Sequence, residues 1–598
     1  MKYRQDIQLL RGIAVLYVVL FHLGIESIQS GFLGVDVFFI ISGFLMAILY
    51  KNDDVKGFYA RRAKRLLPAY YVVILGTLII SFLVNTPNEI NQVVSQAIFG
   101  STFLSNIGFW LQNSYFSKAE FNPLLHLWSL GVEIQFYLVI PILAYVFYKI
   151  RFSLALVLLS SMILCFVVLT ISPKTSFFMM PLRVWQFLLG YGCALYFTNN
   201  GNVKLSQFRW LGCIGLLLIL LIPFLNVDGQ ALDVILGHPG FIALLVSIAT
   251  CMVLLFGLPR EIEKNIIGRV LVKLGQYSYS VYLVHFPVIV LYLSEPFSGT
   301  VLHIASAVDW VIIFTFIVFL SILLHKFIET RKFKIGIVKL SAIFASTTLA
   351  LTLVLPIVKT SFISEQEIKI FSAFEDRSTY RCGKLVRIID PKAISCELSR
   401  GSLDTNNTVL LVGNSHADSI KTTFAKIAGQ NEISTHFIIQ NNPLMPGGLT
   451  PDEIVAEAKQ NSFNHIVVHF SPGGIKSNTL AELVALSQEN NIQVTFIDPV
   501  PVWPVHIPKG MYYQLKGVVN NLHQTKEEYM SIHEEFFADI NKIKNSNFNR
   551  VSVVDYFCNP GCVYKDKEGT PLYFDNGHLT LTGSEILVEA FNKAIEKT

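Results

Sequence analysis

The stretch NTVLLVGNSHAD, residues 407–418, decides how the C-terminal part of the chain folds. After Asn407 and Thr408 it has four consecutive apolar residues, Val409–Val412, and then reaches a turn, Gly413–Asn414, just before Ser415. A short apolar run that ends in turn residues is typical of a buried strand. An amphipathic stretch follows at 416–429, so we predict a strand, a turn and a helix in this order.

The same alternation continues to the C-terminus and predicts an α/β domain. Further β-rich runs lie at 435–440, 465–470, 493–499 and 550–555, and amphipathic stretches lie at 451–461, 478–490, 525–544 and 582–597. Strands that alternate with helices form a parallel sheet in an α/β sandwich. Reactive groups in such sheets lie at the carboxyl ends of the strands, which is where Ser415 falls.

A second stretch, LYFDNGHLTLTGSEIL at 572–587, supplies the partners that a reactive serine needs. Serine is a weak nucleophile alone and needs an adjacent base. His578 is the candidate base, and Asp575 is the candidate group that orients its ring. A helix that begins at Ser415 would favour a developing oxyanion. The combination predicts a Ser–His–Asp triad, and the alternative is a helix-capping serine and a turn-closing aspartate.

The first 360 residues have a different composition. Of the 598 residues, 52% are hydrophobic and only 15% are charged, whereas a soluble domain carries about 25% charged residues. Charges are sparse before about residue 360 and frequent after it. The net charge of +5 is modest and lies mainly in loops beside apolar segments. This distribution favours a membrane domain and argues against nucleic-acid binding.

Apolar runs near the length that a bilayer-crossing helix requires recur along this half. We predict eleven spans, at 7–25, 32–50, 68–86, 132–149, 153–172, 183–198, 208–226, 239–257, 277–295, 305–327 and 339–357. A further apolar stretch, 91–112, is dotted with polar residues, and we predict that it does not cross fully. With a cytoplasmic N-terminus, eleven spans place the Lys/Arg-rich loops inside and the chain after about residue 360 outside.

The cysteines agree with that topology. Four of the eight lie in apolar segments and four lie after residue 380. An even count at close spacing outside the cytosol suggests two disulfides, most simply Cys382–Cys396 and Cys558–Cys562. The alternative is four free thiols in a cytosolic tail. The CNPGC sequence lacks the second Cys/His pair that a zinc site would need, so no metal is predicted.

Two blocks of the C-terminal half, GNSHAD at 413–418 and YFDNGHLT at 573–580, resemble the first and last blocks of the SGNH hydrolase/acyltransferase domain. The resemblance implies that Ser415 is the nucleophile, His578 the base and Asp575 its partner.

The chain departs from the SGNH pattern in two places. The family more often has Asp where this chain has Asn414. Its third block normally supplies an oxyanion-hole Asn, which has no clear match here. Gly473 or Gly474 of HFSPGG, or the NNP stretch at 441–443, are the candidates to replace it, so the oxyanion donors other than the Ser415 N–H stay unassigned.

The membrane half resembles the acyltransferase-3 (AT3) family over nearly all of residues 1–335. The matching stretches are DIQLLRGIAVLYVVLFH (6–22), GFLGVDVFFIISGFLM (31–46), FYARRAKRLLPAYY (58–71), LLHLWSLGVEIQFYLVIP (124–141), PLRVWQFLLG (181–190), YSYSVYLVHFP (277–287) and FIETRKF (327–333). An AT3 membrane domain fused to an extracytoplasmic SGNH domain resembles the O-acetyltransferases that modify bacterial surface polysaccharides. The resemblance implies acetyl-CoA as the acyl donor.

Two ionisable residues lie within the first predicted span. Arg11 and His22 return to within about 20° of one helix face, roughly 16 Å apart along the axis. Such residues are costly within a span and by default functional. The family's R-x10-H motif maps onto them, and His22 is the candidate to take a proton from an acceptor hydroxyl or to pass an acyl group. The alternatives are a boundary arginine and a packing histidine.

A basic stretch, RRAKR at 61–65, lies in a predicted cytoplasmic loop. Arg62 and Arg65 are i and i+3, so they share a face if the segment is helical. Paired guanidinium groups suit a pyrophosphate or phosphate. Because the family's R-x-x-R motif maps here, we predict a coenzyme A site, with an ordinary positive-inside anchor as the alternative.

Further residues match family positions in the membrane half: His126, Trp128, Glu133 and Arg183. Gln186 stands where the family usually has Glu, so we assign it no role. For His285, which opens HFP within a span, packing and function are equally compatible.

The predicted fold is a polytopic α-helical membrane domain followed by a soluble α/β domain with a parallel sheet. We expect an acyltransferase domain with ten spans at 1–335 and an eleventh span at 336–360. An extracytoplasmic extension at 361–400 then leads to the SGNH domain at 401–598.

The predicted function is transfer of an acetyl group from cytoplasmic acetyl-CoA across the bacterial inner membrane to a sugar hydroxyl of a surface polysaccharide. Lipopolysaccharide O-antigen, free or lipid-linked, is the first choice of acceptor, and membrane lipid is the other expected partner. The alternatives are a peptidoglycan O-acetyltransferase, a membrane-anchored glycan esterase and a transporter with a receptor-like tail. A transporter predicts internal repeats or paired broken helices, and the sequence shows no repeat.

Overall fold

The computed structural model divides the chain into two compact units, residues 1–361 and 362–598. It describes residues 4–50, 54–112, 120–200, 206–229, 231–331, 336–379, 382, 390, 393–401, 407–440, 442–518 and 522–596. The described part of the first unit is helical, and the second unit combines helices with one sheet. Residues 361–400, which we predicted as an extension, contribute a helix and a strand to the second unit.

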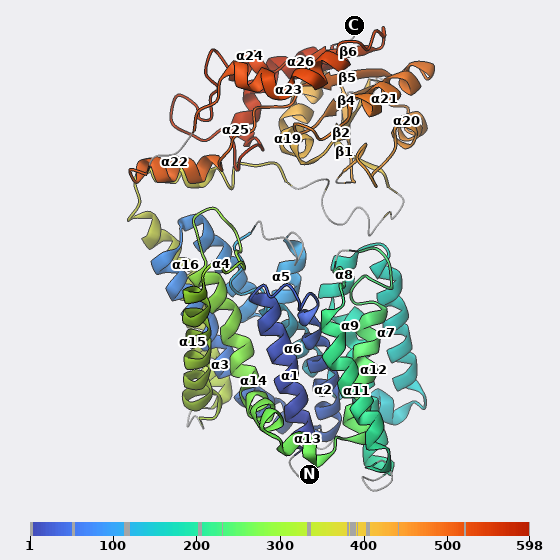
Figure 1. The fold of residues 1–598 in the computed structure, drawn as a ribbon, viewed down its shortest axis with the longest axis vertical. Coiled ribbons are helices and arrows are strands. Elements are labelled where there is room, and N and C mark those ends of the chain that lie inside the picture. Colours follow the sequence, from blue (N-terminus) through green and yellow to red (C-terminus); the bar gives the residue numbers. More distant parts are fainter. Residues whose placement is uncertain are drawn as a thin grey trace. The chain divides into compact units, whose positions relative to one another are not determined.

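Long helices run side by side in the first unit (Figure 1). The α-helices of this unit are α1 (Gln5–His22), α2 (Gly34–Leu49), α3 (Val55–Val84), α4 (Pro87–Ser101), α5 (Ser105–Leu111), α6 (Leu127–Lys149), α7 (Ser153–Leu169), α8 (Pro173–Phe178), α9 (Met180–Asn200), α11 (Arg209–Leu221), α12 (Phe241–Phe256), α13 (Arg260–Lys264), α14 (Ile266–Tyr292), α15 (Ala307–Leu324) and α16 (Ile337–Thr360). Three of them, α5, α8 and α13, are short, with 7, 6 and 5 residues. Every predicted span overlaps one of these helices.

The ambiguous stretch 91–112 is not one helix. It is divided between α4, of 15 residues, and α5, of 7 residues, and Phe103 between them has a positive φ of 60°. A non-glycine residue in this conformation interrupts a helix. Both pieces are shorter than the about 20 residues that cross a bilayer.

Length and composition alone mark five helical segments of the described residues as long and apolar enough to cross a membrane. They are Gly31–Leu49, Val55–Val84, Leu127–Lys149, Ala307–Glu329 and Lys339–Thr360. Ser153–Leu169, Arg209–Phe224 and Phe241–Phe256 are apolar but shorter. The unit therefore has the character of a multi-pass membrane domain.

Glycines let two helix pairs approach closely. A side chain at Gly12 of α1 would collide with the Leu271 carbonyl of α14, and one at Gly275 of α14 would collide with the Gln8 carbonyl of α1. The α2–α9 pair is built in the same way, through Gly43 and Gly190. Small residues at helix contacts are typical of membrane proteins, where van der Waals packing drives association.

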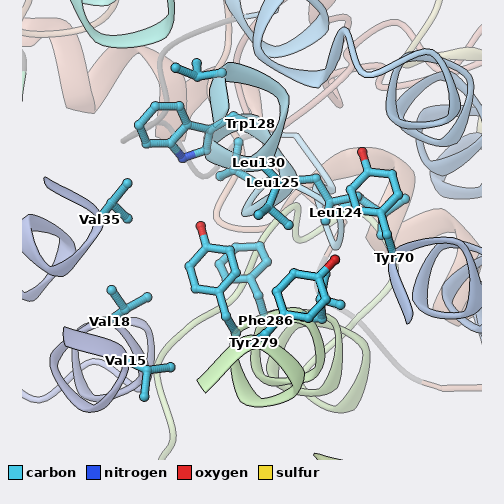
Figure 2. Close-up of a cluster of buried hydrophobic side chains, with 14 of the residues drawn as sticks. Val15, Val18, Val35, Tyr70, Leu124, Leu125, Trp128, Leu130, Tyr279 and Phe286 are labelled. Atoms are coloured by element: carbon cyan, nitrogen blue, oxygen red, sulfur yellow. The ribbon is translucent and has the colours of Figure 1, made fainter. Parts of the chain in front are cut away.

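The helices enclose an aromatic-rich apolar core, part of which Figure 2 shows. Val15 and Val18 of α1 lie there with Trp128 of α6 and with Tyr279 and Phe286 of α14, and all five side chains are buried. Polar groups within such a core must be satisfied by other protein groups.

A fully buried ion pair ties α2 to α9. Arg183 Nη2 lies 2.6 Å from Asp36 Oδ1, and neither side chain is exposed. The Gln186 amide donates to the same oxygen at 2.5 Å, and Arg183 Nη1 lies 3.1 Å from Nε2 of His238. Arg183, which family resemblance had singled out, thus belongs to a polar network within the apolar core.

The second unit contains one six-stranded sheet in the order β1-β3-β2-β4-β5-β6. The strands are β1 (Ser395–Ser399), β2 (Thr408–Gly413), β3 (Ser434–Ile438), β4 (His465–His469), β5 (Gln493–Ile497) and β6 (Phe548–Val551). All residues of the central strand β4 are buried, although successive side chains point to opposite faces. Helices therefore cover both faces, as in the predicted sandwich.

The helices of this unit include the five stretches predicted as amphipathic. They are α17 (Glu365–Ser372), α19 (Ser415–Gln430), α20 (Pro451–Gln460), α21 (Ser477–Glu489), α22 (Ile507–Leu515), α23 (Lys526–Ile540), α24 (Val554–Phe557), α25 (Leu581–Ser584) and α26 (Val588–Ile595).

The prediction of a parallel sheet was wrong at one edge. Strands β2 to β6 are parallel, but β1 pairs antiparallel with β3, so the sheet is mixed. The β1 sequence, SCELS, has no apolar run because an edge strand is only partly buried. The run predicted as a strand at 550–555 also ends early, since β6 stops at Val551 and α24 begins at Val554.

The buried pair makes a testable prediction about stability. Asp36→Ala should destabilise the first unit by about 3–5 kcal/mol, because Arg183 would remain as an uncompensated buried charge. The double variant Asp36→Leu/Arg183→Met should recover most of this loss, since neither charge is then buried. Thermal unfolding of the purified protein in detergent measures both effects, and equal losses in the single and double variants would contradict the assignment.

Candidate active sites

Ser415 lies at the carboxyl end of β2, where α19 begins. Asn414 is the N-cap of α19, and its side-chain oxygen accepts a hydrogen bond from the His416 N–H at 3.1 Å. Asparagine is among the best N-cap residues. Ser415 is exposed while the residues on both sides of it are buried. The local sequence therefore holds one hydroxyl open to solvent at the positive end of a helix.

The predicted triad residues lie together with hydrogen-bonding geometry. Ser415 Oγ lies 2.7 Å from His578 Nε2, and His578 Nδ1 lies 2.6 Å from Asp575 Oδ2. The other carboxylate oxygen accepts from the N–H groups of Gly577 and His578 at 2.8 and 2.7 Å. These backbone bonds fix the carboxylate within the turn that carries the histidine.

The electrostatics of Asp575 fit the role of an orienting group. Burial opposes its charge, but the His578 ring and the two backbone N–H donors outweigh burial and lower the pKa of Asp575 to about 2. The ionised carboxylate accepts from His578 Nδ1–H, so Nε2 carries the lone pair that can accept the serine proton. This arrangement can form and break an acyl-serine.

A residue that sequence reasoning did not single out also contacts the triad. The ring of His416 lies 4.5 Å from that of His578 between centroids. Burial, with smaller effects from His578 and His469, lowers the pKa of His416 well below its usual value. A neutral His416 therefore packs against the base without placing a second positive charge beside it. Its position directly after the nucleophile was the available sequence signal.

One of the oxyanion candidates, the Gly474 N–H, is already used within its own loop. The Gly474 N–H donates to the Ser471 carbonyl at 2.9 Å, so it closes a turn. The Asn414 amide donates to Ser471 Oγ at 2.8 Å. Asn441 lies outside the described residues. The Ser415 N–H, in the first turn of α19, stays the predicted donor.

In the first unit, three arginines predicted from sequence line one cavity. Arg11, Arg62 and Arg65 lie there with Glu133. The cavity is also lined by Ser42, Ser129, Tyr137, Tyr279 and Tyr282. Three guanidinium groups against one carboxylate give the cavity a positive character that suits phosphate groups.

The RRAKR stretch lies within α3. Because the segment is helical, Arg62 and Arg65 lie on the same helix face, as predicted. Arg62 and Arg65 are half-buried against the cavity, whereas Arg61 and Lys64 are exposed. Arg61 pairs with Asp54 at 2.6 Å. The four basic side chains thus divide into two that line the cavity and two that face outward.

Glu133 and His22 each have close polar partners in this unit. Glu133 accepts hydrogen bonds from Ser42 and Tyr137. His22 Nδ1 lies 3.0 Å from Nε2 of His285. The sequence around His285 is equally compatible with packing and with function, and the structure brings this residue into contact with His22.

The hydrogen bonds of this histidine pair assign its protons. His285 Nδ1 lies 2.7 Å from the Tyr282 carbonyl, which can only accept, so Nδ1 carries the proton. Nε2 of a neutral His285 is then an acceptor, and His22 Nδ1–H must donate to it. Nε2 of His22 consequently bears the lone pair. The hydrogen bond to His285 thus leaves His22 Nε2 able to accept a proton or to act as a nucleophile.

Tyr282 and Ser129 connect the histidines with the arginine-lined cavity. Both residues line that cavity, and their hydroxyl groups lie 2.6 Å apart. The Tyr282 hydroxyl also donates to the His126 carbonyl at 2.9 Å. The His126 ring lies 5.8 Å from that of His285 between centroids. His126 therefore joins the histidine cluster.

Two other predicted residues lie apart from this cluster. Trp128 packs against Phe177 at 4.4 Å between ring centroids and is part of the apolar core. Arg183 belongs to the buried pair with Asp36. In the second unit, disulfides join Cys382 to Cys396 and Cys558 to Cys562, the two pairs suggested by spacing.

A helical membrane unit joined to an α/β unit with a Ser–His–Asp triad defines a class of protein, the multi-pass membrane enzymes that handle acyl groups. Family comparison specifies it further. Residues 4–326 match the model described as an acyltransferase domain, and residues 381–593 match that of an SGNH domain fused to AT3 domains. The chain therefore belongs to the acyltransferase-3 family and carries its fused SGNH domain.

Similar proteins are named O-acetyltransferases. The chain is 30% identical over 386 residues to O-acetyltransferase OatA of Staphylococcus aureus strain MRSA252, which covers 59% of this chain and 62% of OatA. OatA of strain NCTC 8325 / PS 47 gives the same identity and coverage. The match thus spans less than two thirds of these relatives.

A solved structure is also similar. The periplasmic domain of a lipopolysaccharide acetyltransferase from Salmonella ser. Paratyphi A is 17% identical, with a TM-score of 0.28, over 40% of this chain and 99% of that domain.

The proton assignment at His22 predicts the effect of changing its partner. His285→Leu removes the acceptor for His22 Nδ1–H and should lower acyl transfer about 10- to 100-fold, by analogy with the loss of a partner that orients a metal-bound histidine. His285→Gln, whose amide oxygen can accept, should retain more activity. Donor binding should stay unchanged in both variants. Equal activities for the Leu and Gln variants across the pH profile would contradict the assignment.

Proposed function

We propose that the protein transfers an acetyl group from cytoplasmic acetyl-CoA to a sugar hydroxyl of a cell-surface polysaccharide, with lipopolysaccharide O-antigen as the acceptor. The observation that carries the proposal is the presence in one chain of two sets of side chains whose geometry suits acyl transfer. One is the arginine-lined cavity with the histidine cluster, and the other is the triad of the second unit. Neither set duplicates the other, since one suits a phosphorylated donor and the other an exposed acceptor.

The first stage would take place in the membrane unit. Arg62 and Arg65 would hold the phosphates of coenzyme A, since guanidinium groups bind phosphate in a bidentate manner. The lone pair on His22 Nε2 would accept the proton of an acceptor hydroxyl or take the acyl group itself. Arg11, on the same helix and in the same cavity, would lie beside the donor.

The second stage would take place at Ser415. Its oxygen attacks the acyl carbonyl carbon while its proton moves to His578 Nε2, and the leaving group departs with that proton. A sugar hydroxyl then attacks the acyl-serine, again losing its proton to His578, and Ser415 is restored. A triad that would hydrolyse an ester in water transfers the acyl group when a sugar occupies the acceptor position.

The topology that this scheme needs also belongs to the proposal. Eleven spans, with the N-terminus in the cytoplasm and 91–112 not crossing, put the triad outside the bacterial inner membrane. The bias of Lys and Arg in the loops and the two disulfides support this arrangement.

The topology can be tested by fusion. Alkaline phosphatase joined after residue 380 should be active, because it folds outside the cytoplasm, whereas a fusion within 258–264 should be inactive. A reporter after residue 380 that works only in the cytoplasm would reverse the assignment.

A staged experiment tests the two sets of groups. Arg62→Ala/Arg65→Ala should weaken acetyl-CoA binding at least about tenfold, because two charge-assisted contacts are lost. Arg61→Ala/Lys64→Ala, which changes two exposed basic residues of the same helix, is the matched control and should bind normally. His22→Ala should bind the donor but pass no acetyl group on, while its triad still cleaves p-nitrophenyl acetate.

Ser415→Ala completes the series. It should bind acetyl-CoA normally and lose glycan acetylation by several orders of magnitude, because triad residues act as a unit. Labelled acetyl-CoA and mass analysis of the acceptor measure both steps. Near-normal acetylation by Ser415→Ala would assign all the chemistry to the membrane unit and reduce the second unit to a binding module.

The same mass analysis identifies the acceptor. Acetyl groups that disappear from O-antigen when the gene is deleted support the proposal. Their loss from peptidoglycan would favour the alternative acceptor.

A further inference from the structure

A pocket of about 580 Å³ lies at the carboxyl ends of β4 and β5. One wall is the loop Ser471–Gly473, which follows β4, and another includes Phe496 of β5. The side chains of His533, Phe536 and Asp539 of α23 complete it. Its volume lies within the range of about 300–1,000 Å³ that is usual for ligand pockets.

The pocket is linked directly to the residue before the nucleophile. Asn414 Nδ2 donates to Ser471 Oγ at 2.8 Å, and the Ser471 N–H lies 3.3 Å from Asn414 Oδ1. A side chain at Gly474 would lie within 3.0 Å of both Asn414 and Ser471, so the loop packs tightly there. Gly473 has a φ of +69°, which a glycine adopts without strain. The loop thus fixes one wall of the pocket relative to Ser415.

The lining combines an aromatic face with hydroxyl and carboxylate groups. Phe536 is half-buried, and its ring lies 5.6 Å from that of Phe496 between centroids. Ser477 Oγ donates to Asp539 Oδ2 at 3.1 Å, which leaves the serine oxygen able to accept. This mixture suits a ligand with apolar C–H faces and many hydroxyl groups.

The charges around the pocket do not favour a phosphorylated ligand. The lining holds two carboxylates, Asp539 and Glu535, and one cation, Lys476. Lys542 pairs with Asp539 at 2.9 Å, so the positive and negative charges balance. Burial, assisted by Arg550, lowers the pKa of His533 to about 4, so this imidazole is neutral near pH 7. A neutral imidazole donates one hydrogen bond and accepts another, as a sugar hydroxyl does.

We propose that this pocket binds a neutral sugar residue of the acceptor glycan, next to the sugar whose hydroxyl reaches Ser415. The inference rests on the proposed function and adds a subsite to it. Phe536 provides the face on which the sugar ring stacks. Asp539, Ser477 and His533 form hydrogen bonds with its hydroxyl groups. The subsite holds the glycan beside the triad, so that a hydroxyl competes with water for the acyl-serine.

A second pocket in the same unit serves as the control. It lies at the amino ends of the strands and is lined by Thr408, His465, Asn491 and Gln493. Since β2 and β4 run from this end toward Ser415, the two pockets are separated by the length of a strand, about 17–20 Å. Substitutions there should leave glycan binding unchanged.

Binding is measured first, with the full-length Ser415→Ala protein in detergent, so that catalysis plays no part. The ligands are chitotetraose and maltotetraose. Saturation-transfer NMR and calorimetry measure their binding. Phe536→Leu keeps apolar volume but removes the ring, and should raise the Kd about tenfold, as expected for loss of one aromatic contact. Phe536→Tyr should restore binding. The control Asn491→Ala should bind as the parent does.

Catalysis is measured second, with Ser415 present. Phe536→Leu should raise the KM for the tetrasaccharide about tenfold, while hydrolysis of p-nitrophenyl acetate stays within about twofold of wild type. That hydrolysis also verifies that the variant is folded. Unchanged Kd and KM in Phe536→Leu, or no binding of either tetrasaccharide to the parent, would overturn the subsite. A parent protein that binds sugar through Phe536 but transfers no acetyl group would sustain the subsite and refute the proposed function.

Discussion

Polar groups within an apolar helical unit must satisfy one another, and this constraint organises the membrane half of the protein. A bilayer offers no water to a buried charge or imidazole, so each such group needs a protein partner. Asp36 and Arg183 meet this need as a pair. His22 meets it through His285. Each partnership also joins two helices, so the polar groups fix the packing of the helices that carry them.

Burial distinguishes the charged groups that are already paired within the core from those that line the cavity. A buried ion pair contributes little net stability compared with apolar residues of the same volume. The arginines of the cavity are different, because Arg62 and Arg65 are only half-buried and line a cavity where three guanidinium groups share one carboxylate, that of Glu133. Guanidinium groups in that position are available to an anionic ligand, whereas Arg183 is already committed to Asp36.

In each unit a hydrogen-bond acceptor orients a histidine through its Nδ1–H group. The two acceptors differ in charge. In the second unit an ionised carboxylate accepts from His578 Nδ1–H. In the first unit a neutral imidazole accepts from His22 Nδ1–H. Both arrangements leave the lone pair on Nε2. Asp575 also stabilises the imidazolium that forms when Ser415 is deprotonated. A neutral His285 provides no such charge, which suits a site where a net charge would be costly.

The sequence by itself determined the class of both halves and all three residues of the triad. The length of the apolar runs, the charge of the loops and the alternation of strands and helices depend on local composition. They can therefore be read from the sequence alone. Ser415 and the D-x-x-H turn were identifiable because each sits in a short motif with a fixed local geometry. The sequence did not reveal β1, since an edge strand has no apolar run, nor the division of 91–112 into two helices.

Only the tertiary structure decided which distant residues meet. His285 lies 263 positions from His22, and nothing in its local sequence distinguishes a packing histidine from a partner. The division of RRAKR into cavity-lining and outward-facing residues required the helix and its neighbours to be placed. The same is true of Ser471, whose contact with Asn414 joins the triad to a pocket. Local sequence sets propensity and periodicity, whereas pairing across the chain depends on how helices and strands pack.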